Sequence, residues 1–200
     1  MTTTRPAFAP GTAAYEPTAW RTRDIVVTAI IAVAFGVVFQ VWNLLWSGFD
    51  AAFVFWPPAK DLLYGVWLVP AVLAPAIVRK PGAALFAELV AAGVSVLFGS
   101  PWGPDTLLSG FVQGAGAELI FAFTLYRSWS FPVLAIAAIA SAAAAWLHDW
   151  VVWNATVATD VQMLRGGIMA ISAVVIVALG SVLLVRALRR AGVLDGFPAG

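Results

Sequence analysis

The chain has 200 residues, of which 62% are hydrophobic and only 10% are charged, and its formal net charge is +1. A soluble domain carries about 25% charged residues, so this composition excludes a soluble protein and predicts one compact bundle of membrane helices. The lack of cysteine excludes disulfides and thiolate metal sites, and the single histidine, His148, argues against a histidine-ligated metal centre. We therefore expect no metal, no cofactor and no nucleic-acid partner.

Residues 1–19 are rich in Thr, Ala and Pro and have no apolar periodicity, which predicts a disordered cytoplasmic tail. A membrane domain is expected over residues 20–195. Several of its apolar runs are close to the lower limit of about 17–20 residues that can cross a bilayer. The sequence thus predicts an all-α integral membrane protein with six transmembrane helices, at residues 24–46, 61–78, 82–98, 106–125, 131–153 and 164–188.

Lysine and arginine in the connections indicate how the bundle is oriented. With the N-terminus in the cytoplasm, nine of the eleven basic residues fall in inner segments, and only Lys60 and Arg165 fall in outer ones. Positive charge is enriched on the cytoplasmic side of membrane proteins. We therefore expect both termini in the cytoplasm.

Two carboxylates, Glu88 and Glu118, lie inside the third and fourth apolar runs. An acid in hydrocarbon costs several kcal/mol, so it indicates a functional site. A rise of about 1.5 Å per residue puts both acids near the bilayer midplane at a similar depth. Gln113, Asn43 and Asp149 lie closer to the outside. Polar groups in the outer half of a bundle predict a ligand pocket that opens outward, with the two glutamates at its floor.

The fifth run carries Trp146, Asp149, Trp150 and Trp153 at i, i+3, i+4 and i+7, which places them on one helical face. Indoles around a carboxylate can stack on a flat heteroaromatic ring and hold a cation. An interfacial aromatic girdle is the alternative. The aspartate favours the binding interpretation, because an acid that faces lipid is costly.

Three further aromatic residues are candidates for the same cavity. Tyr64 and Trp67 lie one turn apart in the second run, and Trp102 lies in an outer loop. Packing against a neighbouring helix is the alternative for the first two. A place in the interfacial belt is the alternative for Trp102.

Small residues suggest close helix packing in two places. Gly110, Gly114 and Gly116 allow a close backbone approach in the fourth run. In the first run, the small residues can form a docking surface for another membrane subunit, although internal packing is the commoner use of such a pattern. These residues are Ala29, Ala32 and Gly36.

Several catalytic motifs are missing from the sequence. It contains no zinc-protease His-Glu pair, no nucleophile elbow and no Walker phosphate loop. The chain therefore cannot hydrolyse ATP by itself. A small, outward-open helical binder without an energy source is expected to be one subunit of a larger machine.

The third and fourth runs also contain a family motif. The run Arg79-Lys80-Pro81-Gly82-Ala83-Ala84 is followed by Glu88, then by Gly99-x-Pro101-x-Gly103-Pro104 and by Gly110-x-x-Gln113-Gly114-x-Gly116-Ala117-Glu118. This pattern resembles the YkoE family, the S components that bind substrate in energy-coupling factor (ECF) vitamin transporters. The motifs cover residues 79–118, and the six-helix layout extends the resemblance over most of the chain.

The resemblance implies that the ligand is thiamine or its hydroxymethylpyrimidine precursor. It also implies a transmembrane coupling subunit and two cytoplasmic ATPases as partners, with the first helix docking on the coupling subunit. The protein is then expected in the plasma membrane of a prokaryotic cell. Other functions stay open at this point. They are an S component for another small heteroaromatic or cationic compound, an intramembrane enzyme that uses Glu88 and Glu118 as an acid/base pair, and an assembly subunit without a ligand.

Overall fold

The computed structural model describes residues 19–199, so the predicted disordered tail lies outside the described residues except for Ala19. Within 19–199 the chain forms helices and connections and no strand. The elements are α1 (Thr22–Gly48), the 3₁₀ helix η1 (Pro57–Leu68), α2 (Val69–Val78), α3 (Ala83–Leu97), α4 (Asp105–Phe123), α5 (Phe131–Val152), α6 (Thr159–Ser172), the π-helix η2 (Ala173–Leu179) and α7 (Gly180–Arg190).

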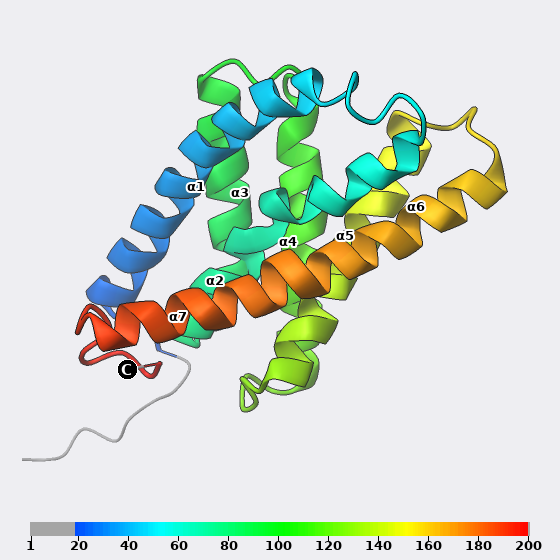
Figure 1. Cartoon of the computed structure of the whole chain (residues 1–200). Helices are drawn as coiled ribbons and strands as arrows, with labels where there is room; N and C mark the ends of the chain where they lie inside the picture. Colours follow the sequence, from blue (N-terminus) through cyan, green and yellow to red (C-terminus); the bar gives the residue numbers. More distant parts are fainter. Residues whose placement is uncertain (1–18, 200) are drawn as a thin grey trace, which may run out of the picture.

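Two of the predicted spans are each made of several elements. η1 continues into α2, and α6 continues through η2 into α7, which forms the long rod across the front of Figure 1. Counted in this way, five helical segments in the described part of the chain are long and apolar enough to cross a membrane, and α3 is a shorter apolar helix of 15 residues. The prediction of an all-α membrane bundle is confirmed, with five segments of spanning length and α3 as a shorter sixth helix.

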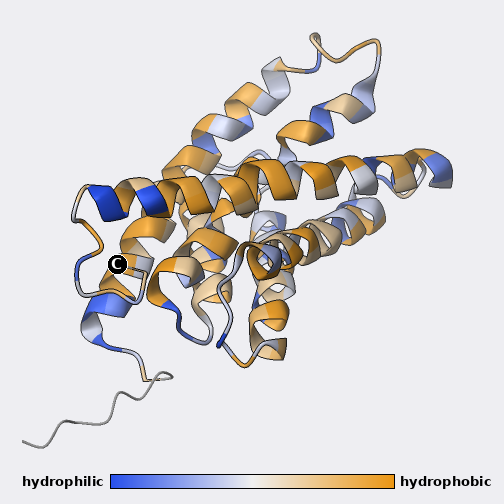
Figure 2. Cartoon of the chain, turned by 60° about the horizontal axis from the view of Figure 1, so that its bottom comes forward, coloured by the Kyte–Doolittle hydropathy of each residue, from blue (hydrophilic) through white to orange (hydrophobic). Residues whose placement is uncertain are grey.

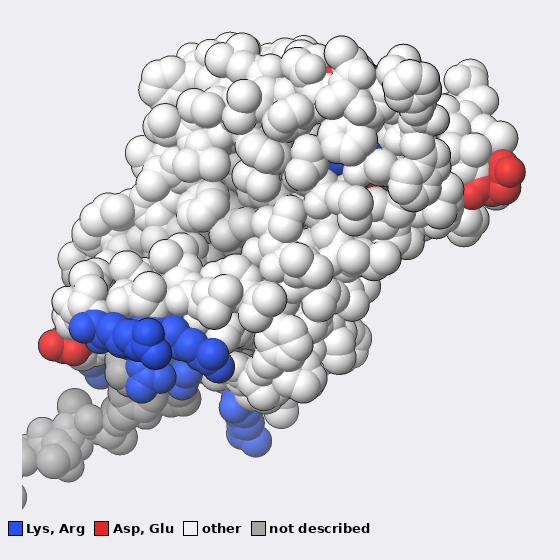
Figure 3. Space-filling view, in the orientation of Figure 1, with Lys and Arg blue, Asp and Glu red and all other residues white. Residues whose placement is uncertain are grey.

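The charged residues gather at the ends of this bundle. In Figure 3, Lys and Arg cluster at the end where α1 begins and α7 finishes. The described ends of the chain meet there with the turn between α2 and α3: the Trp20 indole donates to the Pro81 carbonyl over 3.0 Å, and Leu194 belongs to the same hydrophobic cluster as Ala83. We call this the inner end, in agreement with the positive-inside rule.

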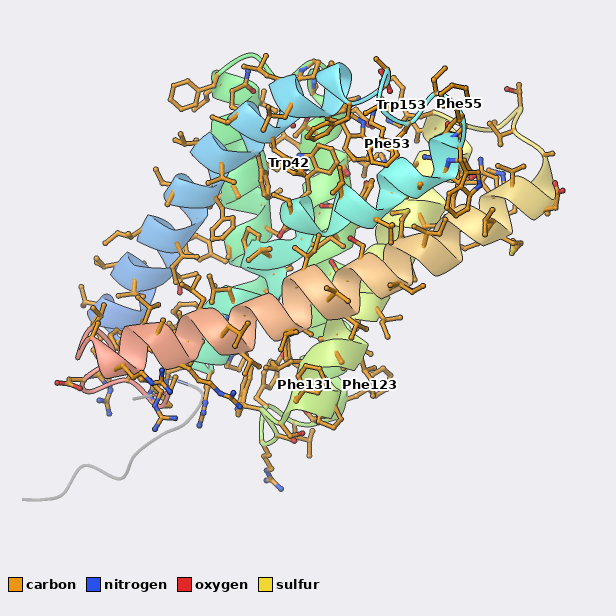
Figure 4. All side chains as sticks on the ribbon, in the orientation of Figure 1. Trp42, Phe53, Phe55, Phe123, Phe131 and Trp153 are labelled. Atoms are coloured by element: carbon orange, nitrogen blue, oxygen red, sulfur yellow. The ribbon has the colours of Figure 1, made fainter. Side chains whose placement is uncertain are left out.

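Between its inner and outer ends, the bundle has a hydrophobic surface around its circumference. Figure 2 shows apolar residues along most of each long helix and hydrophilic residues toward the helix ends. Large aromatic side chains project from both ends in Figure 4: Phe55 is 99% exposed at the outer end, and Phe123 is 82% exposed at the inner end. Such a surface is stable in lipid and not in water.

Glycines in α4 let three helices approach closely. A Cβ on Gly110 would lie 2.6 Å from the Ala92 Cβ in α3, and one on Gly114 would lie 2.9 Å from the Leu85 Cα. On another side of α4, a Cβ on Gly116 would lie 2.7 Å from the Ala140 carbonyl oxygen in α5. The predicted close approach is therefore present, and it presses the backbone of α4 against the segment of α3 that carries Glu88.

The second and sixth spans lose regular α-helical geometry where they touch. The Gly65 N–H donates to the Ser172 hydroxyl over 2.8 Å, and that hydroxyl donates to the Leu62 carbonyl over 2.7 Å. A Cβ on Gly65 would lie 2.9 Å from the Ser172 carbonyl oxygen. Ser172 is the last residue before η2, and Gly65 lies within η1. The two irregular helices are thus locked together, a pattern that often accompanies functional sites.

The small residues of α1 have a different role from the predicted one. Ala32 is fully buried beside Ala74 and Ala87, and a Cβ on Gly36 would lie 2.4 Å from the Val94 Cβ in α3. Both residues therefore serve internal packing, and their predicted docking on another subunit is corrected. Ala29 is only partly buried, and its docking role stays a prediction.

The glycine contacts of α4 generate a stability prediction. Gly114→Ala should lower the free energy of unfolding by about 1–3 kcal/mol, because the new methyl overlaps backbone that cannot move aside. Gly93→Ala is the matched control, since its methyl would meet only the Leu107 side chain at 3.8 Å. Thermal unfolding of the detergent-purified proteins, followed by circular dichroism, compares them. Equal midpoints for Gly114→Ala and wild type would contradict the assigned contact.

Candidate ligand-binding site

A cavity of about 270 Å³ lies in the outer half of the bundle. It extends from the outer loops down to the middle of α3, and its wall takes residues from α1, η1, α3, α4, α5 and α6. This volume is close to the lower end of the roughly 300–1,000 Å³ of small-molecule pockets. The lining residues used below are Asn43, Trp46, Tyr64, Trp67, Glu88, Ser95, Trp102, Asp105, Gln113, Asp149, Trp153 and Arg165.

Glu88 lies at the base of this cavity and is 0% exposed to solvent. Its Oε2 accepts a hydrogen bond of 3.0 Å from the backbone N–H of Ala71, in the first turn of α2. Such N–H groups have no partner inside their own helix, and the helix dipole favours an anion there. The other oxygen, Oε1, is buried and has no hydrogen-bond partner within residues 19–199.

Aromatic rings form one wall of the cavity. The ring centroids of Trp46 and Trp67 are 4.7 Å apart, those of Tyr64 and Trp67 are 5.2 Å apart, and those of Trp67 and Trp102 are 5.5 Å apart. All three pairs meet edge to face, with interplanar angles between 66° and 87°. An edge-to-face contact covers only one face of one ring in the pair, so this wall offers aromatic surface on which a planar ligand can stack.

Amides and hydroxyls hold this wall in position. The Trp67 indole donates to Asn43 Oδ1 over 2.9 Å, and the Asn43 amide donates to Ser95 Oγ in α3 over 3.2 Å. On the opposite side, the Gln113 amide donates to Ser109 Oγ over 2.7 Å. Because both the oxygen and the nitrogen of the Asn43 side chain have partners, we expect it to position Trp67.

Near the mouth of the cavity, His148 joins two aspartates. Its Nδ1 is 3.0 Å from Asp149 Oδ1, and its Nε2 is 3.2 Å from Asp105 Oδ1. Asp149 Oδ2 accepts from Tyr64 Oη over 2.8 Å, and Asp105 Oδ2 accepts from the Trp153 indole over 2.9 Å. This network connects η1, α4 and α5, and it fixes both carboxylates on the cavity wall.

The cavity has an excess of acidic groups. Glu88, Asp105 and Asp149 line it, whereas the only lining cation among the described residues is Arg165. That guanidinium is already paired with Asp61, over 2.7 Å from Nε and 3.3 Å from Nη2. The site therefore favours a cation or a ligand rich in N–H donors. Within residues 19–199, no group of three or more His, Cys, Asp or Glu side chains is placed to hold a metal ion.

Most of the residues predicted from the sequence meet at this cavity. Seven of the ten ligand-binding candidates line it, namely Asn43, Tyr64, Trp67, Glu88, Trp102, Gln113 and Asp149. The lining also includes Trp46, Asp105 and Arg165, which sequence reasoning missed. Each of these three lies toward the outer end of a helix, close to residues that were predicted to bind ligand. That position was the one signal in the sequence that could have identified them.

Glu118 lies elsewhere, and its predicted place at the pocket floor is corrected. Its carboxylate accepts hydrogen bonds at the N-terminus of α3, from the N–H groups of Gly82 at 2.6 Å and Ala84 at 2.9 Å, and from the Tyr126 hydroxyl at 2.8 Å. Burial and the Glu118 carboxylate raise the pKa of Tyr126, so this phenol stays protonated and donates. The depth estimate failed because Glu118 is level with the start of α3, whereas Glu88 lies further along that helix.

Trp146 and Trp150 also lie outside the cavity lining, which corrects two more candidates. The Trp146 indole donates to the Gln162 carbonyl in α6 over 2.8 Å, and its ring packs on Gly166. Trp150 pairs with Trp146 at 5.1 Å between ring centroids. The buried face of α5 is instead its stripe of small residues, which ends at His148. The aromatic pair therefore packs beside α6.

Comparisons with known proteins place this geometry in a family. Residues 23–144 match the family described as the permease component of ABC-type cobalt transport systems. A Bacillus subtilis (strain 168) protein named as an HMP/thiamine permease, YkoE, is 38% identical over 130 residues. That match spans 65% of this chain and 64% of the relative, so it covers less than two thirds of the relative's length.

A solved structure extends the likeness to nearly the whole chain. The crystal structure of an S component of an ECF transporter superposes with a TM-score of 0.85 and 32% sequence identity, over 90% of this chain and 91% of that one. The resemblance to the YkoE family is thus confirmed, and the relatives are membrane transport proteins and not enzymes. The chain belongs to the family of ABC-type cobalt transport permease components, as an integral plasma-membrane protein with the fold of an ECF-transporter S component.

Proposed function

We propose that this chain is the substrate-binding S component of an ATP-driven ECF importer, and that it binds thiamine or its hydroxymethylpyrimidine precursor from the outside. The names of its relatives support this proposal, since one is an HMP/thiamine permease and another is an ECF S component. A transmembrane coupling subunit and two cytoplasmic ATPases would supply the energy.

The unpaired Oε1 of Glu88 is the observation that carries the ligand assignment. A buried carboxylate oxygen without a donor is costly, because it has lost its water and gained no partner. The aminopyrimidine ring shared by both candidate ligands has an exocyclic amine that can donate to this oxygen. The nearby Gln113 amide can accept from or donate to the same planar ring edge.

The rest of the cavity matches the other parts of thiamine. The indole faces of Trp67 and Trp102 offer stacking surfaces for a flat ring. The thiazolium of thiamine carries a positive charge, which the carboxylates of Asp105 and Asp149 near the mouth can balance. The precursor lacks this cation, so the two ligands differ in how much they would use the outer acids.

An enzymatic use of the two glutamates lacks support. An acid/base pair has to reach the same reacting group, but Glu118 lies outside the cavity and its carboxylate is engaged at the start of α3. We therefore assign Glu88 to ligand binding and Glu118 to holding α3.

Replacing each glutamate in turn should separate these two roles. Glu88→Gln keeps the size of the side chain but replaces one carboxyl oxygen with an amide NH₂, which cannot accept a hydrogen bond, and we expect the affinity for thiamine and for hydroxymethylpyrimidine to fall about 10- to 100-fold. Glu118→Gln should leave the affinity close to wild type and lower the free energy of unfolding by about 1–3 kcal/mol, because N–H donors at the start of α3 lose an acceptor.

Isothermal titration of the purified proteins measures the affinities, and thermal unfolding measures the stabilities. If Glu118→Gln weakened binding as much as Glu88→Gln at equal stability, the assignment of roles would be wrong. If the wild type bound neither ligand at micromolar concentration, the ligand class would be wrong. Titration with Co²⁺ belongs in the same series, because the description of the family names cobalt.

The acidic lining also predicts how charge on the ligand affects binding. Thiamine monophosphate should bind about tenfold or more weakly than thiamine, since its phosphate would meet carboxylates near the mouth in a site of low dielectric. Asp105→Asn should narrow this gap by removing one of these charges. Equal affinities of the wild type for the two compounds would contradict the electrostatic account of the cavity.

A further inference from the structure

A second groove, of about 550 Å³, lies at the inner end of the bundle, away from the ligand cavity. Segments that are distant in the sequence form it: the start of α1, the α2–α3 turn, the α4–α5 connection and the residues after α7. Its lining contains three arginines and no carboxylate among the described residues. The lining residues are Arg23, Arg79, Tyr126, Arg127, Trp129, Gly196, Phe197 and Pro198.

The local structure fixes where two of these arginines lie. The Arg23 guanidinium lies over the Phe197 ring, 5.2 Å from its centroid, and Gly196 packs against the same guanidinium. Arg79 follows the last residue of α2 in a left-handed conformation with φ of 54°, which turns the chain sharply into α3. The groove is thus a built feature in which the C-terminal segment covers the start of α1.

Of the acids beside the groove, Asp24 is shared between Arg23 and other groups, and Glu118 is engaged elsewhere. Asp24 accepts from the Arg21 backbone N–H over 3.0 Å and lies 3.9 Å from the Lys80 ammonium, although it is also 3.7 Å from Arg23 Nε. Glu118 accepts from the N-terminus of α3 and from Tyr126. A groove with three guanidinium groups and no lining carboxylate attracts an anion, and arginine binds phosphate with two parallel hydrogen bonds.

The position of the groove in the membrane indicates which anion. Tyr126 and Trp129 line it from the α4–α5 connection, and such rings lie at the level of lipid headgroups. The same connection and its flanks carry exposed apolar side chains: Phe123 is 82% exposed and Leu125 is 66% exposed. Figure 4 shows Phe123 and Phe131 projecting at this end of the bundle. Headgroup-level cations therefore lie next to a surface for acyl chains.

We propose that this groove binds the phosphate headgroup of an anionic phospholipid from the cytoplasmic leaflet. Basic pockets on the cytoplasmic side of membrane helices bind such headgroups, at about 1 kcal/mol for each Lys or Arg near the surface. A lipid bound here would join the C-terminal segment to the α2–α3 and α4–α5 connections. The exposed apolar side chains favour a lipid over free phosphate or an acidic protein, neither of which has acyl chains.

Native mass spectrometry of the full chain, released from nanodiscs of phosphatidylcholine with a minor fraction of phosphatidylglycerol, tests the proposal. We expect the wild type to retain phosphatidylglycerol selectively. The double variant Arg79→Gln/Arg127→Gln should retain it about tenfold less. Arg189→Gln/Arg190→Gln is the matched control, because it removes the same charge from exposed positions at the end of α7 that do not line the groove.

Three results would overturn the proposal. They are equal retention by the two double variants, displacement of the lipid by inorganic phosphate, and unchanged lipid retention by Arg79→Gln/Arg127→Gln together with weaker assembly with an acidic partner subunit. Thermal unfolding in pure phosphatidylcholine checks that the variants fold. If the double variant does not fold, Arg127→Gln alone, at an exposed position, should still reduce retention about fivefold.

Discussion

The structure depends on a carboxylate that is buried within the membrane and only half satisfied. Glu88 Oε2 accepts from the first turn of α2, and this N–H is available because α2 begins inside the bilayer, where the 3₁₀ helix η1 ends. Gly110 and Gly114 bring the backbone of α4 against the same part of α3, which fixes the position of the backbone that carries Glu88. The remaining oxygen lies at the base of an aromatic cavity and has no partner within residues 19–199. A ligand with an N–H donor would complete the site.

The two intramembrane glutamates use one physical device for two purposes. Each accepts backbone hydrogen bonds at the N-terminus of a neighbouring helix, where the helix dipole stabilises negative charge. The Glu118 carboxylate accepts hydrogen bonds from the start of α3 and from Tyr126, so its role is structural. Glu88 makes one such bond and keeps one oxygen for the cavity. Charge is also separated along the bundle, with carboxylates around the outer cavity and arginines around the inner groove.

The helical bundle and most of the cavity residues could be predicted from the sequence, because burial in a membrane limits which structures and which polar residues are stable. Apolar length and basic connections determine the spans and their orientation, and an acid or amide in an apolar span indicates either a site, as at Glu88, or a structural hydrogen bond, as at Glu118. Spacing on one helix was less informative, since it shows which residues share a face but not which neighbour that face meets. Trp146 packs beside α6, and Gly36 packs on α3. The irregular η1 and η2 depend on their mutual contact, which no local pattern reveals.

The central claim is that the free oxygen of Glu88 and the indole wall hold an aminopyrimidine ring. A structure of the protein with thiamine or hydroxymethylpyrimidine bound measures this most directly. The account predicts the exocyclic amine at about 2.7–3.2 Å from Glu88 Oε1 and the ring stacked on an indole of the Trp46, Trp67 and Trp102 wall. A ligand bound in the outer loops, with Glu88 Oε1 still unpaired beneath it, would contradict the account.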